Sequence, residues 1–178
     1  MENRQVEDKS IYKILVVDYK EDNVELLEAR LSPKGYAIEK AYDGEEALKK
    51  LEENSPDLIL LDIMMPKVNG YEVCKKLKTD EKTQFIPIVM ITVLKEMEDK
   101  IKSIEAGADD FISKPFSKYK VIARSRSLLK MRHFTDELEH AETVIGSLAL
   151  SVESKDPYTE GHCARLSMYS AISGRKWA

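Results

Sequence analysis

Apolar and polar positions alternate between two periods over residues 11–130, which indicates short strands separated by amphipathic helices. A short apolar run with turn signals beyond it is typical of a strand buried in a parallel sheet. Such runs predict strands over residues 14–17, 37–41, 58–62, 88–92 and 110–113. Apolar residues at helical spacing predict helices over residues 23–31, 43–54, 71–78 and 97–106, and from Lys118 onward.

Five successive strand–helix alternations predict an α/β domain with a doubly wound, five-stranded parallel sheet and helices on both faces. The carboxyl ends of parallel strands meet at one edge of such a sheet, where open α/β sheets bind their ligands. We expect this edge to gather the polar side chains that end or follow four of the strands: Asp18, Asp62, Thr92 and Lys114.

Beyond the domain, apolar residues are spaced alternately by three and four positions, which is the heptad seam of a coiled coil. The seam consists of Met131, Phe134, Leu138, Ala141, Ile145, Leu148 and Val152. A helix that lay on its own domain would show a broader apolar stripe. The strict two-position stripe therefore favours self-association, and we expect residues 131–155 to form a linker helix that pairs in a parallel homodimer through 131–152.

Composition narrows the classes of function. The chain has 178 residues, 43% of them hydrophobic, and a formal net charge of −4, which gives no reason to expect nucleic-acid binding. Cys74 and Cys163 lack the spacing of a metal site, so a reduced, cytoplasmic protein is expected. Residues 1–10 are polar and predicted to be flexible, and no apolar run is long enough to span a membrane.

The predicted edge of the sheet suits phosphoryl transfer. The carboxylate of Asp62 can attack phosphorus and hold an acyl phosphate. The charged oxygens of the transferred group need a cation and a hydrogen-bond donor, which Lys114 and Thr92 can supply. A second carboxylate, Asp18, would help Asp62 recruit Mg²⁺, which prefers oxygen ligands.

Four motifs in the same order and register resemble the receiver domain of two-component response regulators. They are Val16-Val17-Asp18, Leu60-Leu61-Asp62-Ile63-Met64-Met65-Pro66 with Gly70, Ile91-Thr92, and Lys114-Pro115-Phe116. The resemblance covers residues 11–130 and implies a flavodoxin-like (βα)5 fold. It also implies that a sensor histidine kinase phosphorylates Asp62.

The same resemblance implies roles for further residues. The backbone carbonyl of Met64 would ligate Mg²⁺ together with Asp18 and Asp62, and the Lys114–Pro115 bond would be cis. Phe111 falls at the aromatic switch position of the family. Thr92 would move towards the phosphoryl group as that ring turns inward.

One position departs from the family. Two adjacent acidic residues usually follow the first strand, but here Tyr19 and then Lys20 follow Asp18. A protonated tyrosine, with a reference pKa of about 10, is a poor Mg²⁺ ligand. We therefore expect weakened Mg²⁺ binding and slower phosphorylation without loss of the fold.

Residues 152–162, followed by Arg165-Leu166, resemble the opening of an HD-GYP domain, a family of metal-dependent cyclic di-GMP phosphodiesterases. His162 would match the first metal-binding histidine of that family. The later histidines, the His-Asp pair and the Gly-Tyr-Pro motif are absent, so residues 156–178 are expected to be a fragment without hydrolase activity.

Two classes of function remain open. The first is a phosphorylation-dependent switch, in which Asp62 accepts the phosphoryl group and the C-terminal helix sets dimerisation or an output domain. The second is a pseudo-receiver that works as a dimerisation or docking module without phosphorylation. Tyr19 favours the second hypothesis, whereas Asp62, Thr92 and Lys114 together favour the first.

Overall fold

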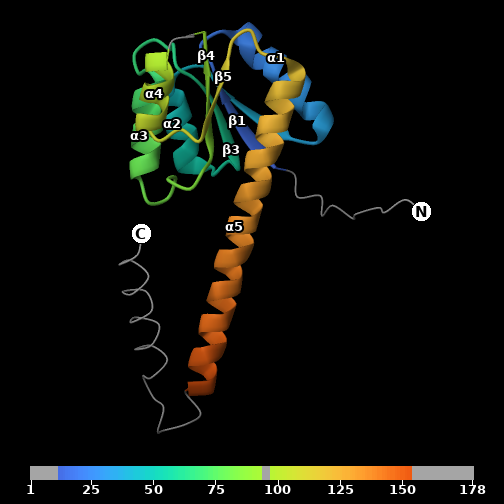
Figure 1. The fold of residues 1–178 in the computed structure, drawn as a ribbon, viewed down its shortest axis with the longest axis vertical. Coiled ribbons are helices and arrows are strands. Elements are labelled where there is room, and N and C mark those ends of the chain that lie inside the picture. The colour runs from blue at the N-terminus through green and yellow to red at the C-terminus, as the bar shows by residue number, and fades with distance from the viewer. Residues whose placement is uncertain (1–11, 94–96, 154–178) are drawn as a thin grey trace, which may run out of the picture. The chain divides into compact units, whose positions relative to one another are not determined.

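A computed structural model describes residues 12–93 and 97–153 of the chain (Figure 1). The predicted flexible N-terminus, residues 1–10, lies outside the described residues. The fragment that resembles an HD-GYP domain, residues 156–178 with His162, also lies outside them.

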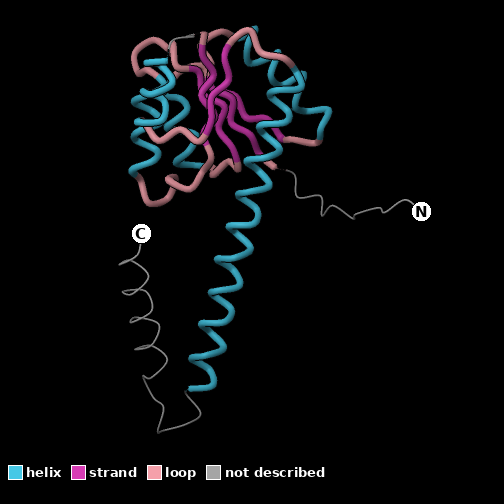
Figure 2. Tube along the Cα trace, in the orientation of Figure 1, coloured by secondary structure: helices cyan, strands magenta, loops and turns pink. Residues whose placement is uncertain are grey.

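The described chain contains one parallel sheet of five strands in the order β2-β1-β3-β4-β5 (Figure 2). Its strands are β1 (Lys13–Val17), β2 (Ala37–Ala41), β3 (Leu58–Asp62), β4 (Ile88–Thr92) and β5 (Asp110–Ser113). The first crossover places β2 on one side of β1, and the later strands extend the sheet on the other side. This order confirms the predicted flavodoxin-like fold.

Helices cover both faces of the sheet. They are α1 (Glu21–Leu31), α2 (Gly44–Glu53), α3 (Gly70–Thr79), α4 (Met97–Glu105) and α5 (Lys118–Glu153), with a 3-10 turn at Ser32–Lys34. The core divides into two clusters because successive side chains of a strand point to opposite faces. One cluster contains buried residues of α1 and α5, and the other contains buried residues of α2 and α3.

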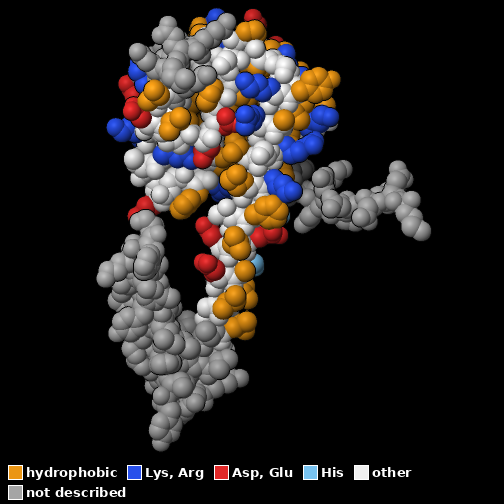
Figure 3. Space-filling view, in the orientation of Figure 1, with side chains coloured by type: hydrophobic (Ala, Val, Ile, Leu, Met, Phe, Trp, Pro, Cys, Tyr) orange, Lys and Arg blue, Asp and Glu red, His pale blue; other side chains and the backbone are white. Residues whose placement is uncertain are grey.

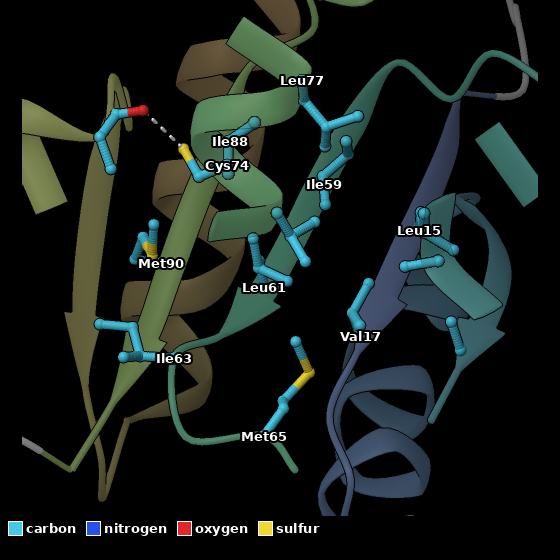
Figure 4. Close-up of a cluster of buried hydrophobic side chains, with 14 of the residues drawn as sticks. Leu15, Val17, Ile59, Leu61, Ile63, Met65, Cys74, Leu77, Ile88 and Met90 are labelled. Atoms are coloured by element: carbon cyan, nitrogen blue, oxygen red, sulfur yellow. Dashed lines mark hydrogen bonds between the residues drawn. The ribbon is translucent and has the colours of Figure 1, made fainter. Parts of the chain in front are cut away.

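The second of these clusters is densely apolar (Figure 4). It includes the side chain of Cys74, whose thiol donates a hydrogen bond to the carbonyl oxygen of Ala106 at 3.3 Å. Burial raises the pKa of the Cys74 thiol to about 11. A thiol that is buried and protonated at neutral pH packs as a small apolar side chain and is not a reactive nucleophile.

The register of the strands aligns their carboxyl ends. Val17 pairs with Leu61, Asp62 pairs with Ile91, and Thr92 pairs with Ser113. The end of β3, the end of β4 and the residues that follow β1 and β5 therefore lie at one edge of the sheet. This alignment is the structural basis of the candidate site.

The chain divides into two compact units, Met1–Arg132 and His133–Ala178. Helix α5 runs without interruption over 36 residues from Lys118 to Glu153, so the fifth helix and the heptad segment are one element. Large seam side chains are exposed, among them Leu138 (67%) and Ile145 (66%). Figure 3 shows hydrophobic side chains following one another along this part of α5. Within residues 12–93 and 97–153, no helix is long and apolar enough to cross a membrane.

Candidate functional site

Two carboxylates and one hydroxyl are buried at the carboxyl edge of the sheet. Asp62 ends β3, Asp18 follows β1, and Thr92 ends β4. The exposed fraction is 2% for Asp62, 1% for Asp18 and 4% for Thr92. Charged residues are almost never this deeply buried unless they are paired, so the site needs a compensating cation.

Lys114, which follows β5, supplies that cation. Its Nζ lies 2.6 Å from Oδ2 of Asp18 and 3.1 Å from Oδ2 of Asp62. The backbone N–H of Lys114 donates to the carbonyl oxygen of Thr92 at 2.5 Å, which ties the end of β5 to the end of β4. One ammonium group therefore bridges both carboxylates, and all four residues expected at this edge lie there.

Asp18 is also fixed by the start of α1. The amide of Asn23 donates to Oδ2 of Asp18 at 2.8 Å, and the backbone N–H of Lys20 donates to Oδ1 at 3.0 Å. Asn23 was not predicted from the sequence. The available signal was an amide side chain in the first turn of the helix that follows the buried aspartate. A side chain in that turn is close enough to reach the end of the strand.

The two carboxylates and the ammonium form a set with an excess of negative charge. Burial raises the pKa of Asp62, and the nearby charge of Asp18 raises it further. The Lys114 ammonium opposes this rise, as does the backbone N–H of Met64. Asp62 is thus held in a site that favours the arrival of additional positive charge.

The loop between β3 and α3 passes close to Asp62. The backbone N–H groups of Met65 and Gly70 donate to the carbonyl oxygen of Ile63 at 3.1 and 3.0 Å. A Cβ at Gly70 would overlap the Asp62 carbonyl and lie 2.8 Å from the Cα of Ile63. Gly70 is therefore required by close backbone approach. Met64, in the same loop, is exposed at 52%.

The remaining candidates lie in β5 and in the segment that follows it. The Lys114–Pro115 peptide bond is cis. Phe111 is partly buried and packs against the cluster that contains Cys74. Its backbone lies in β5, where Met90 of β4 is its pairing partner.

The donor set at the edge fits a hard divalent cation. The carboxylates of Asp18 and Asp62 are oxygen ligands of the kind that Mg²⁺ prefers, and the backbone carbonyl of Met64 is the third ligand that the family resemblance predicts. Tyr19 contributes no carboxylate: it is 44% exposed, with the Lys20 ammonium 5.4 Å from the centroid of its ring. The described residues contain no group of three or more His, Cys, Asp or Glu that could hold a metal.

Comparison with known families identifies the family to which this fold belongs. The response regulator receiver domain matches residues 14–126, which is more than half of the chain. The chain belongs to the response regulator receiver family. Phosphorylation on an aspartate and switching of an output are general features of that family, and receiver domains generally bind Mg²⁺ for phosphorylation.

A curated response regulator and a curated transcriptional regulatory protein illustrate the similarity in sequence. Response regulator PleD of Caulobacter vibrioides is 46% identical over 130 residues, covering 73% of this chain and 29% of PleD. The alkaline phosphatase synthesis transcriptional regulatory protein PhoP of Bacillus subtilis is 44% identical over 154 residues, covering 82% of this chain and 63% of PhoP. The chain thus spans less than two thirds of the length of either relative.

Solved receiver structures are similar in fold. A two-component response regulator from Clostridium difficile is 33% identical with a TM-score of 0.63, covering 67% of this chain and 96% of that one. The chemotaxis response regulator CheY4 of Vibrio cholerae is 29% identical with a TM-score of 0.64, covering 67% and 99%. The receiver portion of this chain accounts for nearly the whole of those structures.

Proposed function

We propose that this receiver domain is a phosphorylation-dependent switch in which Asp62 accepts a phosphoryl group from a sensor histidine kinase. The observation that carries the proposal is the single Lys114 ammonium that contacts both Asp62, at 3.1 Å, and Asp18, at 2.6 Å. A lysine that served only to neutralise one carboxylate would not need to bridge two.

In the proposed reaction, a carboxylate oxygen of Asp62 attacks the phosphorus of a phosphohistidine on the kinase. An O–P bond forms, the P–N bond to the imidazole breaks, and the imidazole leaves with the electron pair of that bond. Lys114 and the hydroxyl of Thr92 then stabilise the oxygens of the acyl phosphate. Thr92 and Phe111 are the proposed switch residues, and their rearrangement would transmit the modification.

Mg²⁺ would neutralise charge on the transferred phosphoryl group, and Asp18, Asp62 and the Met64 carbonyl are the groups proposed to hold it. Tyr19 stands where the family has a second acidic ligand, so we propose that Mg²⁺ binds more weakly here. The hydrogen bonds of Asn23 and Lys20 to Asp18 hold this aspartate rigidly. They support a site that has one acidic residue after β1, where the family has two.

The output of the switch is proposed to run through α5. The exposed heptad seam supports a homodimer through residues 131–152, which would respond to the state of the receiver.

We propose no nucleic-acid or membrane contact for this chain, whose formal net charge is −4, although PhoP is a transcriptional regulator. Residues 156–178 are proposed to be the opening of an HD-GYP domain, in which His162 alone builds no hydrolase site.

A second candidate function rests on Tyr19. A pseudo-receiver would use the same fold for docking or dimerisation and would not be phosphorylated. The exposed Tyr19 ring favours this alternative, because it replaces the second acidic metal ligand of the family and has the Lys20 ammonium beside it. The four retained side chains at the sheet edge weigh against it.

Incubation with acetyl phosphate and Mg²⁺, followed by intact-mass measurement, separates the two functions. The switch predicts one phosphoryl adduct in the wild type and none in Asp62→Asn. The exposed Asp80→Asn is the matched control and should retain the adduct. Absence of an adduct at every Mg²⁺ concentration would support the docking module.

A further inference from the structure

Arg30 makes two contacts with a single residue far away in the sequence. It lies in the last turn of α1, and its Nη1 donates to the carbonyl oxygen of Phe116 at 2.9 Å. Its guanidinium carbon lies 5.3 Å from the centroid of the Phe116 ring. One side chain therefore holds both the backbone and the ring of Phe116, across a sequence separation of 86 residues.

Phe116 is the second residue after Lys114, so this contact bears on the segment that carries the bridging ammonium. On the β5 side, the Lys114 N–H is anchored to the carbonyl of Thr92. On the α5 side, the backbone N–H of Val121 donates to the carbonyl of Ser117, the residue just before the helix. The Phe116 carbonyl lies between these anchors, and it accepts a hydrogen bond from Arg30.

The Phe116 ring is partly buried against the core cluster shared by α1 and α5. Arg30 is itself partly buried, so its donation to a carbonyl is less exposed to competition from water than a contact on an open surface. A planar guanidinium can stack on an aromatic ring and donate from its edge at the same time, whereas an ammonium cannot. The arrangement therefore depends on the shape of the group as well as on its charge.

Helix α1 is thus attached to the site at both of its ends. Asn23, in its first turns, donates to Asp18, and Arg30, in its last turn, donates to Phe116. Asp18 and Lys114 are in turn joined by the ion pair at 2.6 Å. These contacts form a closed ring of interactions through α1, the carboxylate and the lysine segment.

We propose that Arg30 is a positioning residue that fixes Phe116 and thereby holds the Lys114 ammonium between Asp18 and Asp62. The consequence for phosphoryl transfer rests on the proposed function of Asp62, whereas the placement of Lys114 does not. A cation near the carboxyl end of a helix also stabilises the helix through its dipole. That simpler role would be retained by a lysine at position 30.

The test uses the full chain and reads the charge environment of Asp62 directly by carbon-13 NMR titration of its carboxyl group. Because the Lys114 ammonium lowers the pKa of Asp62, a displaced Lys114 should let that pKa rise. Arg30→Met and Arg30→Lys are both expected to shift the Asp62 titration to higher pH. The exposed Arg126→Met removes a charge of the same sign without touching the segment and should leave the titration unchanged.

A second background makes the test specific to Lys114. In Lys114→Met, the further change Arg30→Met should leave the Asp62 titration where Lys114→Met alone places it. An unchanged titration in Arg30→Met would overturn the proposal. The proposal would also be overturned if Arg30→Met shifted the Asp62 titration as much in the Lys114→Met background as in the wild type, or if Arg126→Met gave the same shift. Full retention of the wild-type titration in Arg30→Lys would overturn it as well.

Phosphorylation gives a separate reading. If Asp62 is phosphorylated, Arg30→Met should slow its modification by acetyl phosphate roughly tenfold, since misplacement of a positioned group costs rate. If the wild type takes no phosphoryl group, the proposed function fails, but the NMR titration still decides the role of Arg30. The two failures are therefore distinguishable.

Discussion

Asp62 carries a charge for which its surroundings provide only partial compensation. Burial and the neighbouring Asp18 oppose its ionisation, and Lys114 favours it. Such a carboxylate is costly for the folded state but ready to receive a positively charged partner or a phosphoryl group. The stability of the folded protein should therefore depend on pH through the ionisation of Asp62.

The first prediction concerns this dependence in Asp62→Asn. Since the folded-state pKa of Asp62 is raised above its ordinary value of 3.8, the folded protein binds the proton more tightly than the unfolded one. Ionisation of Asp62 therefore lowers stability as pH rises through the elevated pKa. The variant should be more stable than the wild type at pH 7 in urea unfolding, and this gain should shrink as pH falls towards 3.8.

Glu39→Gln is a suitable control, because it removes a carboxylate from β2 away from the site and should not show the same pH-dependent gain. Equal stability of Asp62→Asn and the wild type at pH 7 would contradict this account of the buried charge.

The second prediction concerns Tyr19. Tyr19→Asp adds an acidic oxygen ligand beside Asp18, so it should tighten Mg²⁺ binding by roughly tenfold or more in isothermal titration calorimetry. Tyr19→Phe keeps the ring without the hydroxyl and should bind Mg²⁺ as the wild type does. A wild-type affinity no weaker than that of Tyr19→Asp would show that the missing acidic residue is compensated elsewhere.

At the residue scale, the four residues at the strand ends could be predicted from the sequence. The topology alone places them at the carboxyl edge of the sheet: Asp18, Asp62, Thr92 and Lys114. The sequence did not predict Asn23 or Arg30. The Arg30 contact with Phe116 joins residues that no local pattern relates, and it depends on how α1 packs beside the segment after β5.

The start of α2 shows how a local contact fixes an element. Asp43 precedes the helix and its Oδ1 accepts from the backbone N–H of Glu46 at 2.8 Å. The Glu46 carboxylate in turn accepts from the backbone N–H of Tyr42 at 2.8 Å. The hydrogen bond from Glu46 is the main cause that lowers the pKa of Asp43, with Lys67 adding to it.

The third prediction follows for Asp43→Ala, which should lower the free energy of unfolding at pH 7 through loss of the cap. Because the folded-state pKa of Asp43 is lowered, its charge-dependent stabilisation is present above 3.8 and is lost as pH falls through the folded-state value. Asp43→Asn retains an accepting oxygen and should lose less than the alanine variant. Equal losses in the two variants, measured by urea unfolding, would contradict a capping role.

Element boundaries were predicted closely where a turn or cap marks them. Four strands, Ala37–Ala41, Leu58–Asp62, Ile88–Thr92 and Asp110–Ser113, have the predicted bounds, and Gly107 adopts a φ of 88° behind α4. Helix α1 begins at Glu21, two residues before the predicted start, because its acidic first turn carried no apolar signal. Nothing in the sequence between Lys118 and Glu153 breaks α5, and Gly146 is accommodated at a cost of about 1 kcal/mol relative to alanine.

At the scale of the whole molecule, the exposed heptad seam is the feature that the receiver fold leaves unexplained. Met131, Phe134 and Leu138 are exposed at 62%, 51% and 67%. The seam lies beyond residues 14–126, which the receiver family matches. Its apolar periodicity supports pairing between copies.

The fourth prediction is that Leu138→Asp weakens the proposed dimer. A carboxylate at a central seam position would have to be desolvated, and a penalty of about 3 kcal/mol corresponds to a rise of roughly a hundredfold in the dissociation constant. Sedimentation equilibrium measures this change. Thr143→Asp places the same charge on α5 away from the seam and should leave association intact. An unchanged mass for Leu138→Asp would remove the seam from the interface.

Whether Asp62 is the phosphoryl acceptor can be decided by locating the modification in the chain. After incubation with acetyl phosphate and Mg²⁺, borohydride reduces an aspartyl phosphate to homoserine, which peptide mass spectrometry assigns to one position. The account predicts homoserine at position 62 and at no other aspartate. Homoserine at position 18 in place of 62, or at no position, would contradict it.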